Sequence, residues 1–397
     1  MLPPSSSLTS HPWRSLIGCA LAAWAVSFAL QGRALAVTQT SDLHRDEEIV
    51  FFPSLAHRVR GGGGWECEIR GCVFEPEKRR LIVGLLRETL ELKHVEMTDQ
   101  EAATFGERTR LFMVDNQRGR TIVVRVGERE HALGKSRPDG QFSGVIRLTE
   151  AELGTGGTRT AQIQAVLPAS DPRRFLGQIN PVEGSGISVI SDIDDTIKAT
   201  QVRDRKLLLR RTFLEPFKPV PGMAEVYRAW ADKSGAQFCY VSASPWQLFL
   251  PLSEFVKSNG FPNGAFYLRK FRWKDQSFLS LFESPERYKP AAIEPLLKQF
   301  PRRQFILVGD AGERDPEIYA GLARRYPQQI ARLLIRDVTG GPADSGRYQT
   351  AFRGLPPGLW QVFRAPAEIL DSCPSHPGGS GSVCRGLAKL ALARAFR

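Results

Sequence analysis

Three aspartates stand close together in the segment VISDIDDTIKAT, residues 189–200. Asp192 and Asp194 lie two positions apart directly after an apolar run, and Asp195 and Thr196 follow them. A turn just past a strand can bring two carboxylates with this spacing to one opening, where one attacks as a nucleophile and the other transfers protons. Asp195 is adjacent to Asp194, so we expect it to point elsewhere and cap the turn. Taken alone, the segment is equally consistent with a solvated loop or the start of a helix.

Other polar residues follow later apolar runs. Ser242 ends the run in YVSASP, Lys289 opens a helix-length segment, Asp310 ends FILVGD, and Asp315 comes five residues later. Phosphoryl transfer through a covalent intermediate needs this set of groups. It uses a carboxylate nucleophile, an acid that later activates water, and a hard divalent cation with oxygen ligands. It also needs a hydroxyl and an ammonium group to bind the phosphoryl oxygens.

The elements that must position these residues change character along the chain. From residue 185 to 372, short apolar runs alternate with helix-length segments, which predicts βαβ units in a doubly wound parallel sheet. Ligands of such sheets bind beyond the carboxyl ends of the strands. Residues 45–180 contain alternating runs separated by Gly and Pro, which indicates a β-rich, sandwich-like domain of antiparallel strands. Helices are expected to interrupt it at 77–92 and within 98–116.

Four segments together resemble a known family. SDIDDTIKAT, YVSASPWQL, YKPAAIEPLL and LVGDAGERDPEIYA follow the order of the four signature motifs of the haloacid dehalogenase superfamily. They are most similar to the actin-patch-associated phosphatidate phosphatase family and its bacterial relatives. The resemblance covers residues 185–340 and is weaker over the N-terminal domain. It implies a haloacid dehalogenase-like catalytic domain and a magnesium-dependent phosphatase.

The resemblance also implies roles for the acidic residues. Asp192 would be the nucleophile that becomes an aspartyl-phosphate, and Asp194 the general acid and base. Magnesium would be held by the carboxylates of Asp192 and Asp310 and by the backbone carbonyl of Asp194. Asp315 would contribute through water or from just outside the ligand set.

Three further residues would bind substrate by the same resemblance. Ser242 and Lys289 would grip the phosphoryl group, with Lys289 also assisting catalysis, and Thr196 would lie beside them. The intervals 196–242 and 242–289 leave no room for a sizeable cap domain. An open crevice suits large substrates such as phospholipid headgroups or phosphoproteins. Phosphatidate is expected from the resemblance alone, whereas the residues themselves indicate phosphomonoester hydrolysis.

The chain of 397 residues carries a net charge of +12, which favours anionic partners. No nucleic-acid-binding motif accompanies this charge, so a nucleic acid partner is not expected. The basic stretches 202–211 and 268–275 are consistent with peripheral membrane contact or with a solvated face. The basic tail, 373–397, is expected to be flexible and to lie on a membrane or on the protein itself.

The first 36 residues have the pattern of an export signal. Arg14 precedes an apolar stretch at 16–30, and Ala34-Leu35-Ala36 offers a cleavage site before Val37. A periplasmic or secreted protein is expected, with an uncleaved anchor as the alternative.

Cysteine spacing agrees with an oxidising compartment. The pairs Cys67/Cys72 and Cys373/Cys384 are candidates for short-loop disulfides, although free thiols are the alternative. Cys239 lies inside an apolar run and is expected to be a buried small hydrophobe.

The positions of the six histidines disfavour two rival classes of enzyme. All six lie outside residues 185–372, which disfavours histidine phosphatases and Ser-His-Asp hydrolases. A phosphatase acting on another bulky phosphomonoester is one alternative, and a non-catalytic envelope lipid-binding protein is a second. A metal-dependent glycosyltransferase that uses the aspartates to hold a sugar nucleotide is the third.

Overall fold

The computed structural model describes residues 39–76, 87–88, 95–154, 160–270, 286–340 and 346–374. By its internal contacts the chain divides into residues 1–40 and 41–397, and the architecture below belongs to the second unit. Several predicted features lie outside the described residues. These are the export signal, the helix at 77–92 apart from residues 87–88, the end of the basic stretch 268–275, and the tail beyond residue 374.

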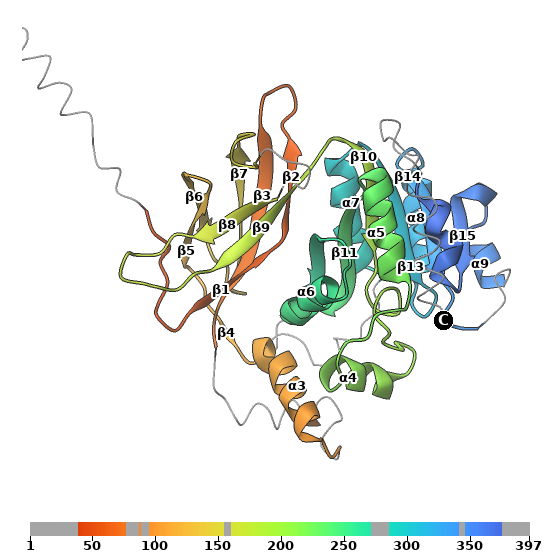
Figure 1. Cartoon of the computed structure of the whole chain (residues 1–397), viewed down its shortest axis with the longest axis horizontal. Helices are drawn as coiled ribbons and strands as arrows, with labels where there is room; N and C mark the ends of the chain where they lie inside the picture. Colours follow the sequence, from red (N-terminus) through yellow and green to blue (C-terminus); the bar gives the residue numbers. More distant parts are fainter. Residues whose placement is uncertain are drawn as a thin grey trace, which may run out of the picture. The chain divides into compact units, whose positions relative to one another are not determined.

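The N-terminal part forms a β-rich sheet of nine strands (Figure 1). The strands are β1 (Glu48–Phe52), β2 (Ser54–Arg58), β3 (Trp65–Glu75), β4 (Asp115–Asn116), β5 (Thr121–Val126), β6 (Arg129–Lys135), β7 (Gln141–Leu148), β8 (Ala161–Ala165) and β9 (Leu176–Val182). Their order is β1-β3-β2-β9-β8-β5-β6, with β4 and β7 paired to β3. The pairings are antiparallel except that β2 and β9 run parallel.

One long strand explains why a single sheet forms instead of a two-sheet sandwich. β3 pairs with β7 along one edge, and its other edge pairs first with β2 and then with β1. All nine strands therefore stay in one hydrogen-bonded network. β6 and β7 lie at the two ends of this network. Gly144 of β7 comes so close to Leu133 of β6 that a Cβ on the glycine would lie 2.7 Å from it, which shows that the two ends meet. The sheet therefore curls around its own core. The β-rich prediction is confirmed, and the sandwich is corrected to one curled sheet.

The alternation along β3 also decides the state of two cysteines. Cys67 faces the core of the curled sheet, whereas Cys72 faces a second core that also contains residues from 187 onward. They lie five residues apart on one strand, roughly 17 Å at the usual rise, and point to opposite faces. Both are free and buried, so the predicted disulfide between them is wrong. Cys373 is also a free, buried cysteine, while Cys384 lies outside the described residues.

Helix α3 (Asp99–Thr109) interrupts the strands within the predicted segment 98–116. Its start has a capping box: the Thr98 side chain accepts from the Glu101 N–H, and the Glu101 side chain accepts from the Thr98 N–H. A short 3-10 turn, η1 (Arg110–Phe112), follows. The expected helix is confirmed.

The sheets change between Val182 and Ser185, and the following strands are all parallel. They are β10 (Ser185–Ser191), β11 (Gln237–Pro245), β12 (Gly264–Arg269), β13 (Arg302–Asp310), β14 (Ile330–Arg336) and β15 (Trp360–Phe363). Their order is β12-β11-β10-β13-β14-β15, so the chain runs outward from β10 in one direction and then in the other. The strand order reverses beside β10, which is where ligands of such sheets bind. The predicted parallel sheet is confirmed.

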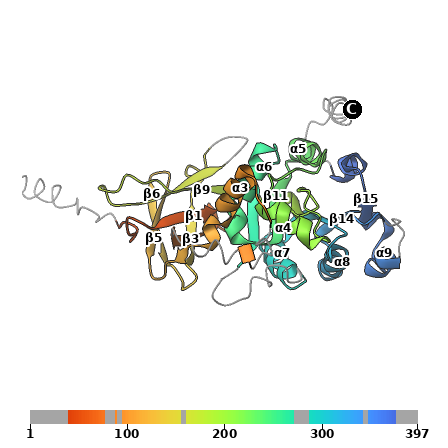
Figure 2. The same cartoon turned by 90° about the horizontal axis from the view of Figure 1, so that it is seen from below.

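Helices cover both faces of this sheet. They are α4 (Arg205–Phe213), α5 (Met223–Ser234), α6 (Phe249–Ser258), α7 (Tyr288–Gln299), α8 (Asp315–Arg325) and α9 (Gly346–Ala351). Short 3-10 turns are η2 (Trp246–Leu248), η4 (Pro357–Leu359) and η5 (Pro366–Ser372). In the view from below, α5 and α6 lie on one side of the sheet, and α7 and α8 on the other (Figure 2).

Burial on both faces explains the continuous apolar run in β10. Val189 packs into the core that contains Trp230 of α5, while its neighbour Ile190 packs into the core that contains Leu297 of α7. Successive strand residues point to opposite faces, so both must be apolar when both faces are covered. Cys239 of β11 is 4% exposed, as expected for a small buried hydrophobe. None of the described helices combines the length and the hydropathy that a membrane span requires.

Candidate active site

The loop after β10 is shaped by Asp195. This residue has a positive φ of 54°, and its carboxylate accepts hydrogen bonds from the backbone N–H groups of Thr200, Gln201 and Val202, each at 2.7 Å. Its own carbonyl accepts from Arg336 at 2.6 Å. Asp195 therefore caps the turn, as predicted, and its carboxylate is occupied by the loop backbone.

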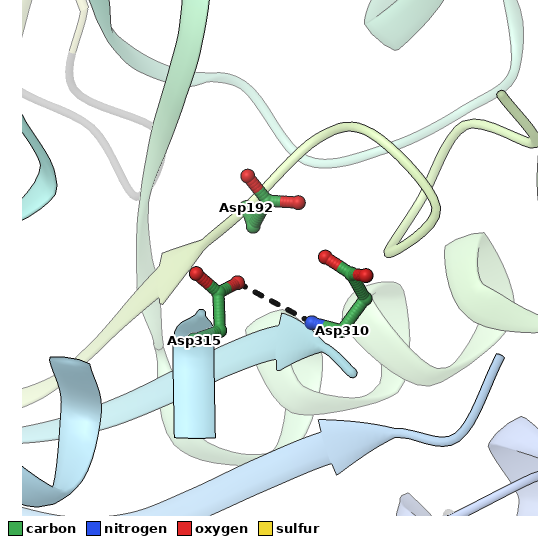
Figure 3. A group of neighbouring side chains, drawn as sticks. All are labelled: Asp192, Asp310 and Asp315. Atoms are coloured by element: carbon green, nitrogen blue, oxygen red, sulfur yellow. Dashed lines mark hydrogen bonds between the residues drawn. The ribbon is translucent and has the colours of Figure 1, made fainter. Parts of the chain in front are cut away.

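Three carboxylates meet at the carboxyl edge of the parallel sheet (Figure 3). Asp192 follows β10, Asp310 ends β13 and Asp315 opens α8, and one oxygen of each lies within 4.8 Å of the others. All three are buried, at 1% exposure or less. The spatial convergence that the strand ends predicted is therefore observed.

This cluster fits a hard divalent cation. Asp310 Oδ1 accepts from the Gly312 N–H at 2.6 Å, but Asp310 Oδ2 is buried and has no hydrogen-bond partner among the described atoms. Burial, with the neighbouring carboxylates Asp315 and Asp192, raises the pKa of Asp310 well above its usual range. Burial likewise raises the pKa of Asp192, against the opposing effect of Lys289. Hard divalent cations bind carboxylate oxygens, and here one such oxygen lacks a partner and lies among buried like charges.

Lys289, at the start of α7, is fully buried between three carboxylates. Its Nζ lies 2.5 Å from Asp315 Oδ1, 2.9 Å from Asp192 Oδ1 and 3.1 Å from Glu313 Oε2. Burial opposes the ammonium form, yet these carboxylates outweigh it and raise the pKa of Lys289. Thr196, also buried, donates to Asp192 Oδ2 at 3.1 Å. The predicted site residues Lys289 and Thr196 therefore both contact the predicted nucleophile.

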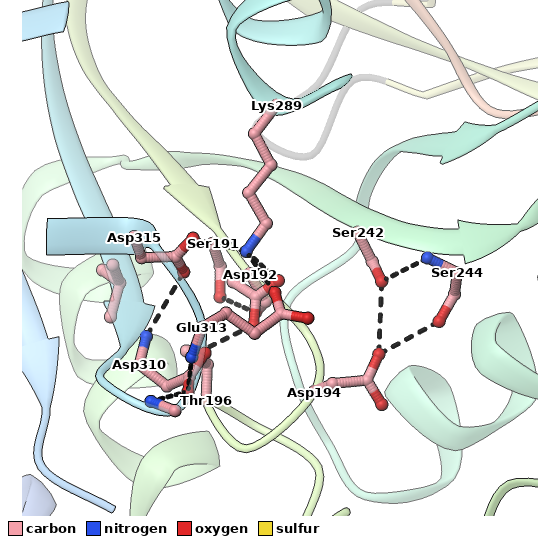
Figure 4. Close-up of polar contacts among 12 residues, drawn as sticks. Ser191, Asp192, Asp194, Thr196, Ser242, Ser244, Lys289, Asp310, Glu313 and Asp315 are labelled. Atoms are coloured by element: carbon pink, nitrogen blue, oxygen red, sulfur yellow. Dashed lines mark hydrogen bonds and ion pairs between the residues drawn. The ribbon is translucent and has the colours of Figure 1, made fainter. Parts of the chain in front are cut away.

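Asp194 stands apart from this cluster in a cage of its own (Figure 4). Its Oδ1 lies 2.6 Å from Lys198 Nζ and accepts from Thr200 Oγ1 at 2.8 Å. Its Oδ2 accepts from Ser242 Oγ at 3.2 Å and from Ser244 Oγ at 3.0 Å. Burial alone would raise the pKa of Asp194, but Lys198 and the hydroxyl groups outweigh it and lower the pKa. The carboxylate of Asp194 is thus not part of the three-aspartate cluster, and a metal contact through its backbone carbonyl stays a prediction.

Two serines contact Asp194 because both lie near the end of β11, which is longer than we predicted. The strand does not end at Ser242 but continues to Pro245, with an irregular register against β12 between these residues. Ser242 and Ser244 lie two positions apart and so present their hydroxyl groups to the same side. Ser242 Oγ also accepts from the Ser244 N–H at 3.0 Å.

Sequence reasoning missed four residues of the site: Lys198, Thr200, Ser244 and Glu313. Each had a weak signal. Lys198 lies four residues after Asp194, Ser244 repeats Ser242 at a strand-like spacing, and Glu313 stands between Asp310 and Asp315. Their contacts depend on how the loops close in space, which spacing alone does not reveal.

A separate cavity of about 690 Å³ lies elsewhere. It is lined by β1, β9 and α6, including Phe51, Leu176 and Leu250. None of the carboxylates described above lines it, so the chemistry of the buried cluster, and not this cavity, defines the candidate active site.

A parallel sheet that gathers buried aspartates and a lysine at its carboxyl edge is an arrangement suited to phosphoryl transfer. Residues 187–337, which contain the whole cluster, match the model of the family described as "Phosphatidate phosphatase APP1, catalytic domain". This segment is thus similar to a catalytic domain of the phosphoric monoester hydrolase class.

Two curated relatives show how far the likeness extends. Phosphatidate phosphatase APP1 of Saccharomyces cerevisiae is 36% identical over 178 residues, which are 44% of this chain and 30% of that protein. An uncharacterised protein of Schizosaccharomyces pombe is 32% identical over 170 residues, 42% of this chain and 27% of that protein. The chain thus spans less than a third of the length of these relatives.

Proposed function

We propose that the protein is an exported, magnesium-dependent phosphatase that hydrolyses phosphatidate to diacylglycerol through an aspartyl-phosphate on Asp192. The observation that carries this proposal is the buried group of Asp192, Asp310, Asp315 and Lys289 within a segment that matches a phosphatase catalytic domain. A haloacid dehalogenase-like, doubly wound fold is part of the proposal. The strand order and the two cores on opposite faces of the sheet support it.

Asp192 would act as the nucleophile because of its position and partners. It lies at the carboxyl end of the central strand, where Lys289 and Thr196 hold its two oxygens at 2.9 Å and 3.1 Å. Asp192, Asp310 and Asp315 would hold the magnesium ion. The buried Asp310 Oδ2, which has no hydrogen-bond partner among the described atoms, would be one of its ligands. When bound, the ion supplies positive charge that offsets the repulsion between a carboxylate and a phosphate ester.

Asp194 would donate a proton to the leaving oxygen and then accept one from the attacking water. It must therefore take up a proton before the first step, although Lys198 and the hydroxyl groups lower its pKa before substrate binds. It is held from both oxygens by Lys198, Thr200, Ser242 and Ser244, so its direction is set before substrate arrives. Ser242 and Lys289 would turn from their present carboxylate partners to the phosphoryl oxygens. Charge accumulates on those oxygens in the transition state, so donors aimed at them accelerate the reaction.

Further observations support the proposals of a lipid substrate and of peripheral membrane contact. The yeast relative is named for phosphatidate hydrolysis, and by their length the intervals 196–242 and 242–289 leave no room for a sizeable cap domain. Arg203, Arg205 and Lys206 are exposed at the start of α4, directly after the loop that Asp195 caps. Basic side chains at such a place attract anionic lipid headgroups. The proposed export to the periplasm or medium is supported by the pattern of the first 36 residues.

The test is phosphate release by the purified mature protein, with magnesium or with EDTA. Phosphatidate and lysophosphatidate are compared with nucleotides and sugar phosphates, and Asp192→Asn is the matched control. We expect phosphatidate to be the preferred ester, with EDTA and Asp192→Asn each abolishing release. Equal rates on soluble esters would contradict the lipid assignment while leaving a phosphatase of another phosphomonoester. Binding of lipid without turnover by the wild-type protein would favour a non-catalytic lipid-binding role.

A further inference from the structure

Helix α3 of the N-terminal part reaches the catalytic part through Arg108. This guanidinium is 7% exposed, and its Nη1 donates to the carbonyl oxygen of Thr212 at 2.8 Å. Its Cζ lies 3.4 Å from the ring centroid of Phe217, within cation–π range. Burial lowers the pKa of Arg108 to about 10, so the group stays a cation at neutral pH.

A second cation lies over the same ring. Lys198 Nζ is 4.7 Å from the Phe217 centroid, and Lys198 is 2% exposed. The same Nζ lies 2.5 Å from Thr200 Oγ1 and 2.6 Å from Asp194 Oδ1. An unbroken series of contacts therefore runs from Arg108 through Phe217 and Lys198 to Asp194.

Helix α3 and helix α4 are joined by a second contact that holds this series in place. Arg210 of α4 pairs with Glu101, in the first turn of α3, and with Glu215 at 2.8 Å. Glu215 lies two residues before Phe217. The segment that carries the ring is thus held to α3 from two points.

We propose that Lys198, braced by Phe217 and Arg108, is the positioning residue that holds Asp194 for proton transfer, so that helix α3 completes the catalytic site. This proposal rests on the proposed phosphatase function and deepens it. Lys198 acts through Asp194 and does not touch the substrate. Phe217 acts one contact further back, and Arg108 two contacts further back.

The chemistry of the two half-reactions explains why Asp194 needs such a partner. An oxygen of Asp192 attacks phosphorus, the bond to the ester oxygen breaks, and that oxygen takes the proton of Asp194. A water oxygen then attacks phosphorus and gives its proton to Asp194, and the bond to Asp192 breaks to release phosphate. Between these steps Asp194 is a carboxylate in a buried site. An ammonium group 2.6 Å away stabilises that charge and keeps the oxygens directed.

This role predicts an effect that depends on the leaving group. An alkoxide, as in phosphatidate, leaves only with a proton, whereas p-nitrophenolate leaves well without one. Lys198→Met should lower kcat on phosphatidate in detergent micelles about 100-fold, in line with the usual contribution of general acid catalysis. On p-nitrophenyl phosphate the loss should be about tenfold smaller, and KM for either ester should change less than about threefold.

Substitution of Phe217 or Arg108 should cause the same pattern of kcat losses on the two esters, with smaller values. Phe217→Leu and Arg108→Met should each lower kcat on phosphatidate about three- to tenfold, because each removes a cation–π contact that helps to hold Lys198. Their effect on p-nitrophenyl phosphate should be smaller still. Arg110→Met is the matched control, since Arg110 follows α3 and pairs with the half-buried Glu48 at 3.0 Å. It should leave both rates unchanged.

A double-mutant cycle tests whether Lys198 acts through Asp194. In an Asp194→Asn background, Lys198→Met should cause no further loss of kcat, because the group it positions is already gone. Thermal unfolding of each variant shows whether it is folded. Phe217→Leu keeps every charge in place and carries the test if Lys198→Met does not fold.

Three results would overturn the proposal. Equal losses on phosphatidate and p-nitrophenyl phosphate would assign Lys198 to phosphate binding or to structure. Additive losses in the cycle would show that it does not act through Asp194. A wild-type protein that hydrolyses neither ester would remove the phosphatase function and the proposal together, whereas an active wild type with an unselective Lys198→Met removes the proposal alone.

Discussion

The two acidic groups at the carboxyl edge of the sheet differ in how their charge is balanced. In the first group, Lys289 contacts three carboxylates, Asp192, Asp315 and Glu313, and a fourth, Asp310, lies beside two of them. Around Asp194, one carboxylate faces the ammonium of Lys198 and three hydroxyl groups. Burial and repulsion raise the pKa of Asp192 and Asp310, whereas Lys198 and the hydroxyls lower that of Asp194.

This difference teaches that the two groups have different tasks. The first has more buried carboxylates than ammonium groups, so its excess negative charge must be offset by proton uptake or by a bound cation. Such a group is suited to hold a metal ion. The second is neutral overall within the chain and fully hydrogen-bonded. Removing an acid should therefore have opposite effects on stability in the two places.

The largest effect is expected for Asp192→Asn. Loss of the nucleophile should lower phosphate release at least about 1,000-fold. Because the change removes one of several repelling carboxylates, the metal-free variant should unfold at a higher temperature than the wild type. Phosphate release and thermal unfolding in EDTA measure both. Residual turnover near the wild-type rate would assign the nucleophile elsewhere.

Asp194→Asn, in the second group, should have the opposite effect on stability and destabilise the protein. The ammonium of Lys198 would remain buried without its counter-charge, which costs about 3–5 kcal/mol when one partner of a buried pair is removed. Hydrolysis of phosphatidate should fall about 100- to 1,000-fold. Urea unfolding of Asp194→Asn beside Asp192→Asn checks the sign. If both variants were stabilised, the charge comparison would be wrong.

Adding magnesium should stabilise the first group alone. At 100 times its dissociation constant, a ligand that binds only the folded state adds about 2.7 kcal/mol to the free energy of unfolding. The unfolding temperature of the wild type should therefore rise with magnesium and fall back with EDTA. Asp310→Asn should lose this rise, and Ser244→Ala should keep it. A rise that persists in Asp310→Asn would place the ion outside the three-aspartate cluster.

The smallest effect is expected for Ser244→Ala. One hydrogen bond to a charged group contributes about 1.5–3 kcal/mol, but Ser242, Thr200 and Lys198 remain on Asp194. We expect kcat on phosphatidate to fall about three- to tenfold with KM unchanged. Ser253→Ala, on α6 and away from both groups, serves as the control. A change in KM with kcat intact would assign Ser244 to substrate binding instead.

Much of the architecture was predictable because local patterns carry it. The apolar run of β10, buried on both faces, and the strand-ending residues Asp192 and Asp310 indicated a parallel sheet with acids at one edge. The crossover rules of such sheets then bring these acids together. The capping role of Asp195 was likewise local, since it binds backbone groups only five to seven residues ahead.

Errors arose where a decision depended on distant partners. Cys67 and Cys72 are close in sequence, but a single extended strand directs them to different cores. The curled sheet depends on β3 pairing with β1 and β2 from one part of the chain and with β7 from another. The length of β11 depends on its neighbour β12.

The amino-acid sequence by itself determined the order of elements, the parallel sheet and which acids end its strands, because strand and helix periodicity are properties of neighbouring residues. Only the tertiary structure decided that Lys289 meets Asp192, that Lys198 and two serines enclose Asp194, and that Arg108 of α3 reaches Phe217. These contacts join segments up to about a hundred residues apart. Their strength comes from burial, which only the closed fold supplies.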